Sequence, residues 1–228
     1  SPMALNAMAA AAGKVHFYPD GDAFYLKHKL SSRLGVKPGE LIFGNGSNDV
    51  LDLAARAFLA PGDEAVMGEY AFIVYPISTK AVGANAVISP MPDYKHDLRD
   101  MYLRITPRTK AVFIANPNNP TGTMVGRDEM EWFLDKVPEE VLIVIDEAYF
   151  EYVTEEDYPD SLTYRESGKS ILTVRTFQDL RSRRAEDRLW RELGTYNMRT
   201  PQGKASVQHQ LFSSGGGYGG ARRRGACK

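Results

Sequence analysis

The stretch that decides the fold is V-F-I-A-N-P-N-N-P-T-G at residues 112–122, followed further along by V-L-I-V-I-D-E-A-Y-F-E-Y at residues 141–152. Each stretch begins with a short apolar run, too brief for a buried helix and ended by polar residues, which predicts a strand buried on both faces. Ligands of open α/β sheets bind at the carboxyl ends of the strands. We therefore expect Asn119 and Asp146 to face one crevice.

Strand and helix patterns alternate outward from these two runs. Strands are expected at residues 41–43, 64–67, 85–88, 110–115, 141–145 and 170–176. Helices are expected at residues 24–34, 50–59, 73–82, 98–105 and 127–137, with a further small-residue helix at the start of the chain. This alternation predicts an α/β fold with a mostly parallel sheet covered by helices on both faces.

The composition is that of an ordinary globular protein, with 43% hydrophobic and 25% charged residues in a chain of 228. No apolar run reaches the roughly 18 residues of a membrane span, so no membrane partner is expected. The first residues also lack the pattern of a signal peptide. The single cysteine, Cys227, allows no intrachain disulfide and fits a cytoplasmic location.

The net charge of −1 conceals an asymmetry between two parts of the chain. Eleven of the 28 basic residues but only four of the 29 acidic residues lie after residue 177. Residues 1–177 are therefore acidic and residues 178–228 basic, which indicates two parts of different character that meet at Phe177.

Five motifs follow one another along residues 1–177: Y-P-D-G at 18–21, G-N-G-S-N-D at 44–49, E-Y-A-F at 69–72, N-P-N-N-P-T-G at 116–122 and D-E-A-Y-F-E-Y at 146–152. Together they make the chain resemble the fold-type I pyridoxal-phosphate-dependent aminotransferases, and within them the histidinol-phosphate aminotransferases. The resemblance implies pyridoxal 5'-phosphate (PLP) as cofactor, a small-molecule amino donor and a 2-oxo acid as substrates, and a homodimer.

The resemblance places the cofactor phosphate at Ser47 and Asn48. Glycines in this strand-to-helix turn let the backbone come close to a ligand, and the start of a helix offers free N–H groups and about half a positive charge. The alternative is a plain helix N-cap formed by Ser47.

Four residues are expected around the cofactor ring. Asp146 would hold the proton on the pyridine nitrogen, because a nearby carboxylate favours the charged ring. By resemblance, Asn119 and Tyr149 would contact the phenolic oxygen, and Tyr70 would stack on the ring. The alternatives are an N-cap or surface ion pair for Asp146, a turn residue for Asn119 and a core tyrosine for Tyr70.

Two further residues correspond to family positions that contact the phosphate. Tyr18 matches a tyrosine that reaches the cofactor of the partner subunit, and Thr176 matches a hydroxyl residue three positions before the family's lysine. A tyrosine packed in a turn and an ordinary strand residue are the alternatives. Glu147 is expected to be structural.

No metal site is expected in this chain. The four histidines have no metal-ligand spacing and are predicted to lie on the surface or in helices: His16, His28, His96 and His209.

The Schiff-base lysine of the family is missing from its place. The family motif is R-T-F-S-K, whereas this chain has Arg175, Thr176 and Phe177 followed by Gln178 and Asp179. The lysine both bonds to the cofactor and moves the proton in the reaction. Because Asp179 stands at its expected place, no catalytic residue is predicted in the chain as written.

A change of reading frame near the Phe177 codon explains the missing lysine. Plausible codons for the tail, read one base out of frame, permit S-K-I-Y-G-L-A-G-L-R-I-G-Y-G-G, which contains the lysine motif and the family's next motif, L-R-I-G-Y-G. We therefore expect residues 1–177 to be a partial PLP-binding large domain, without the family's N-terminal arm and smaller domain. Residues 178–228 are expected to be an out-of-frame tail, disordered or arbitrary in structure.

A basic, Arg/Gly-rich nucleic-acid-binding extension is the rival explanation of the tail. It ranks lower because the tail has few aromatic residues and no ordered motif, so no nucleic-acid partner is expected. The predicted function is PLP-dependent transamination between histidinol phosphate and 2-oxoglutarate. A catalytically inactive PLP-binding fragment and an aromatic amino-acid aminotransferase are the alternatives.

Overall fold

A five-stranded parallel sheet forms the centre of the computed structural model, which describes residues 2–18, 20–176 and 196–197. The strand order is β3-β2-β4-β5-β6, and each neighbouring pair is parallel. The strands are β2 (Glu64–Gly68), β3 (Asn85–Ser89), β4 (Thr109–Ala115), β5 (Leu142–Asp146) and β6 (Ile171–Val174).

Six α-helices are found in the described residues. They are α1 (Pro2–Ala11), α2 (Phe24–Leu34), α3 (Gly46–Phe58), α4 (Val74–Ala81), α5 (Leu98–Leu103) and α6 (Arg127–Lys136). Short 3₁₀ helices lie at Ala12–Lys14, Pro38–Glu40, Pro92–Tyr94, Phe150–Tyr152 and Ser161–Glu166.

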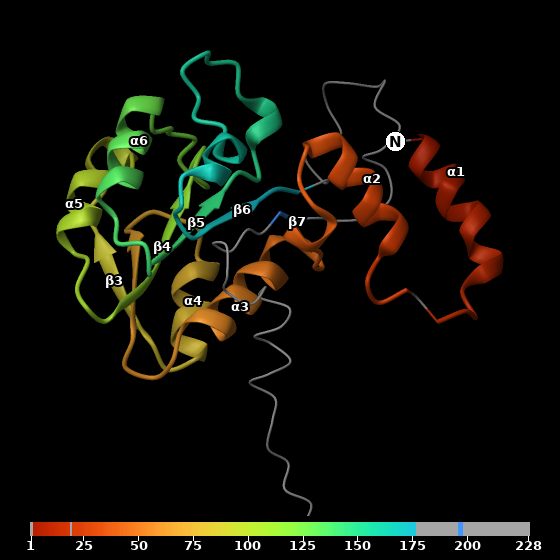
Figure 1. The fold of residues 1–228 in the computed structure, drawn as a ribbon, viewed down its shortest axis with the longest axis horizontal. Helices are drawn as coiled ribbons and strands as arrows, with labels where there is room; N and C mark the ends of the chain where they lie inside the picture. The colour runs from red at the N-terminus through yellow and green to blue at the C-terminus, as the bar shows by residue number, and fades with distance from the viewer. Residues whose placement is uncertain (1, 19, 177–195, 198–228) are drawn as a thin grey trace, which may run out of the picture.

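The sheet is the middle of three layers. Along β4, Ala111, Phe113 and Ala115 pack in one core with residues of α3 and α4, whereas Val112 and Ile114 pack in a second core with residues of α5 and α6. This is the two-residue alternation of a strand that is buried on both faces. Figure 1 shows the two helix pairs on opposite sides of the sheet. The predicted fold class is confirmed.

The strand expected at residues 41–43 is present, but it does not belong to the main sheet. It forms β1 (Leu41–Ile42), which is not in the main sheet but pairs antiparallel with β7 (Tyr196–Asn197). The run is too short to cross the sheet, whereas a two-residue pairing needs only one partner strand. Apart from these two residues, the predicted out-of-frame tail lies outside the described residues.

No helix in the described part of the chain is both long and apolar enough to cross a membrane. The same residues contain no group of three or more His, Cys, Asp and Glu side chains placed to hold a metal ion.

Candidate functional site

The carboxyl ends of β4, β5 and β6 lie level with one another. Ala115 pairs with Asp146, which in turn pairs with Val174. Main-chain hydrogen bonds continue past the strand ends, from Asn116 N to Asp146 O at 2.9 Å and from Glu147 N to Val174 O at 2.8 Å. The loops that carry the predicted site residues therefore start at one edge of the sheet.

Asp146 is a buried carboxylate at this edge, with 5% of its surface exposed. The Tyr75 hydroxyl donates to its Oδ2 at 2.8 Å, and the main-chain N–H of Ala148 donates to its Oδ1 at 3.2 Å. Burial raises the pKa of Asp146 to about 6, because a charged carboxylate loses its hydration there. Both alternatives for Asp146, an N-cap and a surface ion pair, are wrong because the side chain is inside the protein.

The N-P-N-N-P-T-G loop is held by the two asparagines other than Asn119. The Asn116 amide bonds to both main-chain polar groups of Val125, at 2.9 and 3.2 Å. The Asn118 amide nitrogen donates to the main-chain oxygen of Tyr70 at 3.0 Å and to Thr121 Oγ1 at 2.8 Å. Asn118 thus ties this loop to the one after β2. Our sequence analysis did not single out Asn118, although the repeated Asn-Pro pattern could have drawn attention to it.

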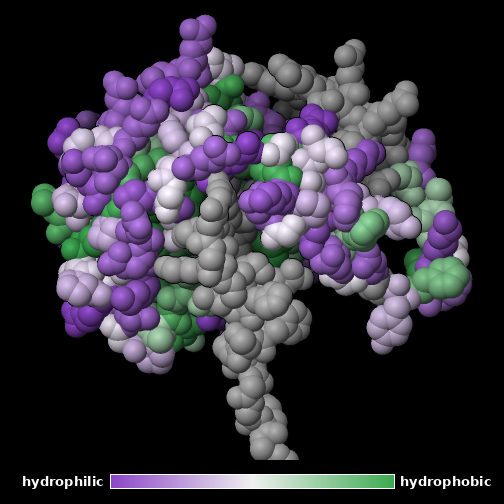
Figure 2. Space-filling view, in the orientation of Figure 1, coloured by the Kyte–Doolittle hydropathy of each residue, from purple (hydrophilic) through white to green (hydrophobic). Residues whose placement is uncertain are grey.

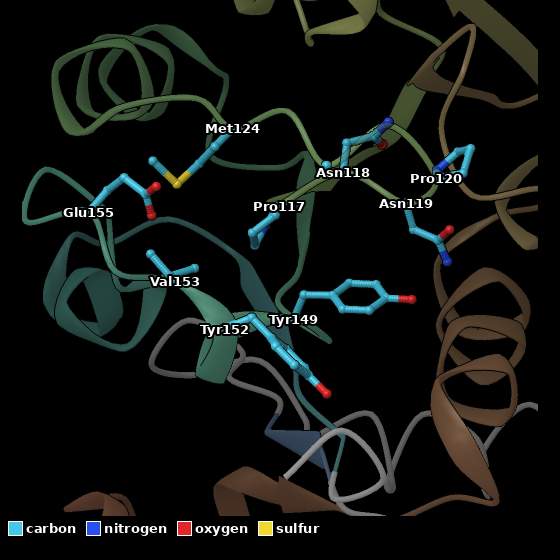
Figure 3. A pocket seen from close by; sticks show the side chains of 10 residues that line it. Pro117, Asn118, Asn119, Pro120, Met124, Tyr149, Tyr152, Val153 and Glu155 are labelled. Atoms are coloured by element: carbon cyan, nitrogen blue, oxygen red, sulfur yellow. The ribbon is translucent and has the colours of Figure 1, made fainter. Parts of the chain in front are cut away.

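A pocket of about 390 Å³ lies beside this loop and is lined by Asn119 and Tyr149, among others. Figure 3 shows the Asn119 amide directed from the loop toward the hydroxyl end of the Tyr149 ring. Tyr152 and Glu155 also line this pocket. Two of the predicted cofactor residues, from different loops, therefore share one cavity.

Tyr70 follows β2 at the same edge of the sheet. Its side chain is 43% exposed, so the core-tyrosine alternative is wrong. The ring lies 5.2 Å from that of Tyr94, centroid to centroid, at an angle of 58°. An exposed ring next to the loops is available to a ligand.

Helix α3 begins at Gly46, so Ser47 lies inside the first turn and is not its N-cap. Asn45 occupies the N-cap position without a side-chain cap, and its N–H donates to Asp49 Oδ2 at 3.0 Å. Gly44 has no room for a side chain, since a Cβ there would lie 2.9 Å from the Asp49 Cβ. The close turn thus depends on glycine, and the N-terminus of α3 is free of a side-chain cap from Asn45.

Tyr18 does not join the other predicted residues within one chain. It is fully exposed on the segment between α1 and α2. In Figure 1 this N-terminal part lies to one side, beyond α2 as seen from the sheet. The alternative of a tyrosine packed in a turn is wrong because its side chain is uncovered.

Thr176 is buried two residues beyond β6, next to a buried ion pair that our sequence analysis missed. The Arg175 guanidinium donates to Glu147 Oε2 at 2.8 Å and to Asp160 Oδ1 at 2.6 Å. It also lies 3.6 Å from the centroid of the Phe150 ring. The expected structural role of Glu147 is confirmed. The ion pair links the residue after Asp146 to the residue before Thr176.

The prediction that His96 lies on the surface or in a helix is wrong. His96 is in a loop with 4% of its surface exposed, and burial lowers its pKa to about 4. A Cβ added to Gly68 would lie 2.7 Å from the His96 ring and 2.5 Å from Met91 Sδ. The imidazole is a neutral packing element that fills the space left by a glycine.

An open parallel sheet with polar loops at its carboxyl edge defines an α/β protein that binds its ligand at that edge. Comparison with known families agrees with this class. The model of the aminotransferase class I and II family matches residues 2–177, and the chain belongs to this family.

Curated relatives are similar over the same region. A histidinol-phosphate aminotransferase 2 of Methylococcus capsulatus is 49% identical over 183 residues, which are 78% of this chain and 49% of the relative. A protein of the same name in Pseudomonas aeruginosa is 50% identical over 177 residues, 78% of this chain and 48% of its own length. The chain thus spans about half the length of these relatives.

A solved structure has the same fold. It is the histidinol-phosphate aminotransferase of Sinorhizobium meliloti in complex with pyridoxal-5'-phosphate, with a TM-score of 0.77 and 26% identity. The match covers 94% of this chain and 55% of that chain.

Proposed function

We propose that the carboxyl edge of the sheet binds PLP and that the full-length protein is a histidinol-phosphate aminotransferase. Its substrates would be histidinol phosphate as amino donor and 2-oxoglutarate as acceptor. The observation that carries the proposal is the buried Asp146 carboxylate, level with the loops that bear Asn119 and Thr176. The names of the relatives and of the solved complex support the same interpretation.

The residues present fit the chemical groups of PLP. With a pKa of about 6, Asp146 is mostly ionised at neutral pH and suits a protonated ring nitrogen. Asn119 and Tyr149 offer hydrogen-bond donors for the phenolic oxygen from one pocket. The N-terminus of α3, with Ser47 and Asn48, suits a phosphate because the first N–H groups of a helix have no partner within the helix and the helix dipole is positive there.

Two more residues complete the proposed site. Thr176 would add its hydroxyl to the phosphate contacts, and the exposed Tyr70 ring would cover one face of the cofactor ring. When bound, PLP supplies an electron sink for negative charge at the substrate carbon. The ionised Asp146 would keep the proton on the ring nitrogen, while Tyr149 and Asn119 would orient the ring.

The group that would move the proton is absent from the chain as written, because Asp179 stands where the family has lysine. We therefore infer that this chain binds the cofactor without catalysis and that residues 178–228 arise from a changed reading frame. The family match ends at residue 177, in support of this inference. A cytoplasmic location belongs to the proposal and is supported by the single cysteine.

We also propose that the intact protein is a homodimer in which Tyr18 reaches the cofactor phosphate of the partner subunit. Large apolar side chains are exposed along the N-terminal segment, namely Leu5, Met8, Val15, Phe17 and Tyr25. Figure 2 shows hydrophobic surface at the margin where Figure 1 places this segment. Exposed apolar groups gathered on one segment favour burial against a partner.

The proposal is tested by titrating the purified chain with PLP and then reducing it with borohydride. We expect saturable binding that Asp146→Asn weakens at least about ten-fold, the loss of one charge-assisted contact. Borohydride should fix no cofactor to the protein, because the lysine is missing. A specific reducible adduct would contradict the missing-lysine inference, and an absence of saturable binding would contradict the site.

The changed reading frame has its own test. Resequencing the coding DNA across the codons for residues 175–181 should place a lysine codon two positions after Phe177 in the shifted frame. Protein made from that frame should convert histidinol phosphate in the presence of 2-oxoglutarate. If that protein reacts with aromatic amino acids but not with histidinol phosphate, the proposed amino donor is wrong.

A further inference from the structure

In the described part of the chain, Tyr75 on α4 is the side chain that donates a hydrogen bond to Asp146 at the end of β5. It is completely buried, and its hydroxyl donates to Asp146 Oδ2 at 2.8 Å. The other carboxylate oxygen accepts from the main-chain N–H of Ala148. Because a buried carboxylate is strongly destabilised without hydrogen bonds, these two donors are what the site supplies in place of water.

The position of the Tyr75 hydroxyl is set by aromatic packing. The Tyr75 ring stacks on Phe113 of β4, with centroids 5.0 Å apart and planes at 17°. Phe72 meets the same ring edge-on, at 5.8 Å and 87°. A phenol ring held on two sides has little freedom to rotate. Its hydroxyl is therefore fixed relative to β4 and β5, and it can fix the carboxylate in turn.

The charges around Asp146 do not stabilise its ionised form, so a hydrogen bond from Tyr75 is needed. The neighbouring Glu147 acts on Asp146 by like-charge repulsion. Arg175, which follows the strand partner of Asp146, is engaged by Glu147 and Asp160. Among the described residues, Asp146 forms no ion pair with a basic side chain. A neutral donor, rather than a cation, thus stabilises its ionised form and leaves its negative charge uncompensated.

We propose that Tyr75 is a positioning residue that holds the Asp146 carboxylate ionised and in one orientation for the cofactor's ring nitrogen. The cofactor part of this statement rests on the proposed function. The contact between Tyr75 and Asp146 is independent of the proposed function, because it is present in the protein without a cofactor. A cationic ring nitrogen requires a carboxylate that is oriented toward it and not already neutralised. A cationic side chain next to Asp146 would compete with the ring for the negative charge of the carboxylate.

The direct test is a carboxyl NMR titration of the full chain without cofactor, labelled with ¹³C at aspartate. The Asp146 signal is assigned by its loss in Asp146→Asn. Tyr75→Phe removes one oxygen and should raise the Asp146 midpoint by about one to two pH units, the value of one hydrogen bond to a charged group. An unchanged midpoint would overturn the proposal.

Tyr158→Phe is the matched control for loss of a buried hydroxyl. That hydroxyl donates to the main-chain oxygen of Asn116 at 2.6 Å and interacts with the Glu147 carboxylate rather than with that of Asp146. Its removal should lower the melting temperature but leave the Asp146 midpoint in place, and an equal shift would contradict the proposal. If Tyr75→Phe does not fold, Phe113→Leu loosens the stacked ring and keeps the hydroxyl. A smaller rise of the Asp146 midpoint is then expected, and an unchanged midpoint would contradict the proposal.

A binding measurement separates this inference from the proposed function. PLP is compared with its deaza analogue, in which a C–H group replaces the ring nitrogen. Tyr75→Phe should weaken PLP binding about ten-fold and leave the binding of the analogue unchanged. Equal losses for both compounds would overturn the positioning role. If the unaltered chain binds neither compound, the proposed function fails, whereas the NMR titration still decides the role of Tyr75 toward Asp146.

Discussion

Asp146 is the residue whose chemistry depends most on its surroundings. On its own, an aspartate at the end of a strand is a polar stop signal with an ordinary pKa. Burial at the level of the β4 and β6 ends raises its pKa to about 6, and the Tyr75 hydroxyl lowers it again in part. Burial and the two hydrogen bonds, from Tyr75 and from the main-chain N–H of Ala148, thus leave the carboxylate ionised at neutral pH but near its midpoint.

This raised pKa predicts how stability depends on pH. Because the folded-state pKa lies above the usual 3.8, protonation of Asp146 favours folding. That contribution is complete below pH about 4 and is lost as the pH rises through about 6. Asp146→Asn removes the effect, so the free energy of unfolding of the variant, relative to that of the parent, should rise by about 3 kcal/mol between about pH 3 and about pH 8.

Urea unfolding at several pH values measures this difference. Both proteins share all other titrating groups, so only the change in their difference with pH is informative. Parallel stability curves would show that the ionisation of Asp146 is not coupled to folding.

Element by element, the site depends on contacts that join one strand end to the next. The ion pair between Arg175 and Glu147 joins the end of β6 to the end of β5, and both side chains are buried. Asn118 joins the loop after β4 to the loop after β2. These contacts help to set the relative positions of Asp146, Asn119, Tyr70 and Thr176.

Breaking the ion pair from one side should be strongly destabilising. Arg175→Met leaves Glu147 buried without its partner, and a loss of about 3–5 kcal/mol in the free energy of unfolding is expected. In the double variant Arg175→Met with Glu147→Leu, most of this loss should disappear because no charge remains buried alone. Denaturant unfolding of both variants measures the effect. If the double variant is as unstable as the single one, packing rather than charge is responsible.

The end of β2 depends on Gly68 for close packing. A methyl group there would meet Met91 and His96, which are both buried. We expect Gly68→Ala to lower the free energy of unfolding by about 1–3 kcal/mol through overpacking. Gly39→Ala is the matched control, since nothing lies within 4 Å of its added Cβ. Equal thermal stabilities of the two variants would show that the His96 side can move aside.

For the whole molecule, the three layers form a core that leaves the N-terminal segment exposed. Val15 is 82% exposed and Phe17 66% exposed, while the helices on the sheet are well packed. If this segment contacts a partner subunit, the double variant Val15→Ser, Phe17→Ser should shift the protein from dimer to monomer. Sedimentation analysis measures the change. Leu103→Ser on α5, with a side chain 78% exposed, is the control that should leave the assembly unaltered.

The fold could be predicted from the sequence because its signals are local. The side chains of the apolar run at β4 alternate between the two cores. The buried apolar residues of α3 and α6 recur at intervals of three and four residues, which is the spacing of one helix face. The loops that follow β4 and β5 do start at one edge of the sheet, as predicted. A shared crevice for Asn119 and Asp146 stays a prediction, because the pocket lined by Asn119 is not lined by Asp146. Burial of His96 was not predictable, because a single histidine in a loop has no periodic pattern to reveal what covers it.

By itself, the sequence determined the alternation of strands and helices, the edge of the sheet where polar loops gather, and the absence of lysine at residue 179. These depend on spacing between near neighbours and on residue identity, which can be read along the chain. Only the tertiary structure decided that Tyr75 bonds Asp146, 71 residues away, and that Arg175 pairs with Glu147, 28 residues away. Such pairings follow from the order of strands in the sheet, because that order brings distant segments together and excludes water from between them.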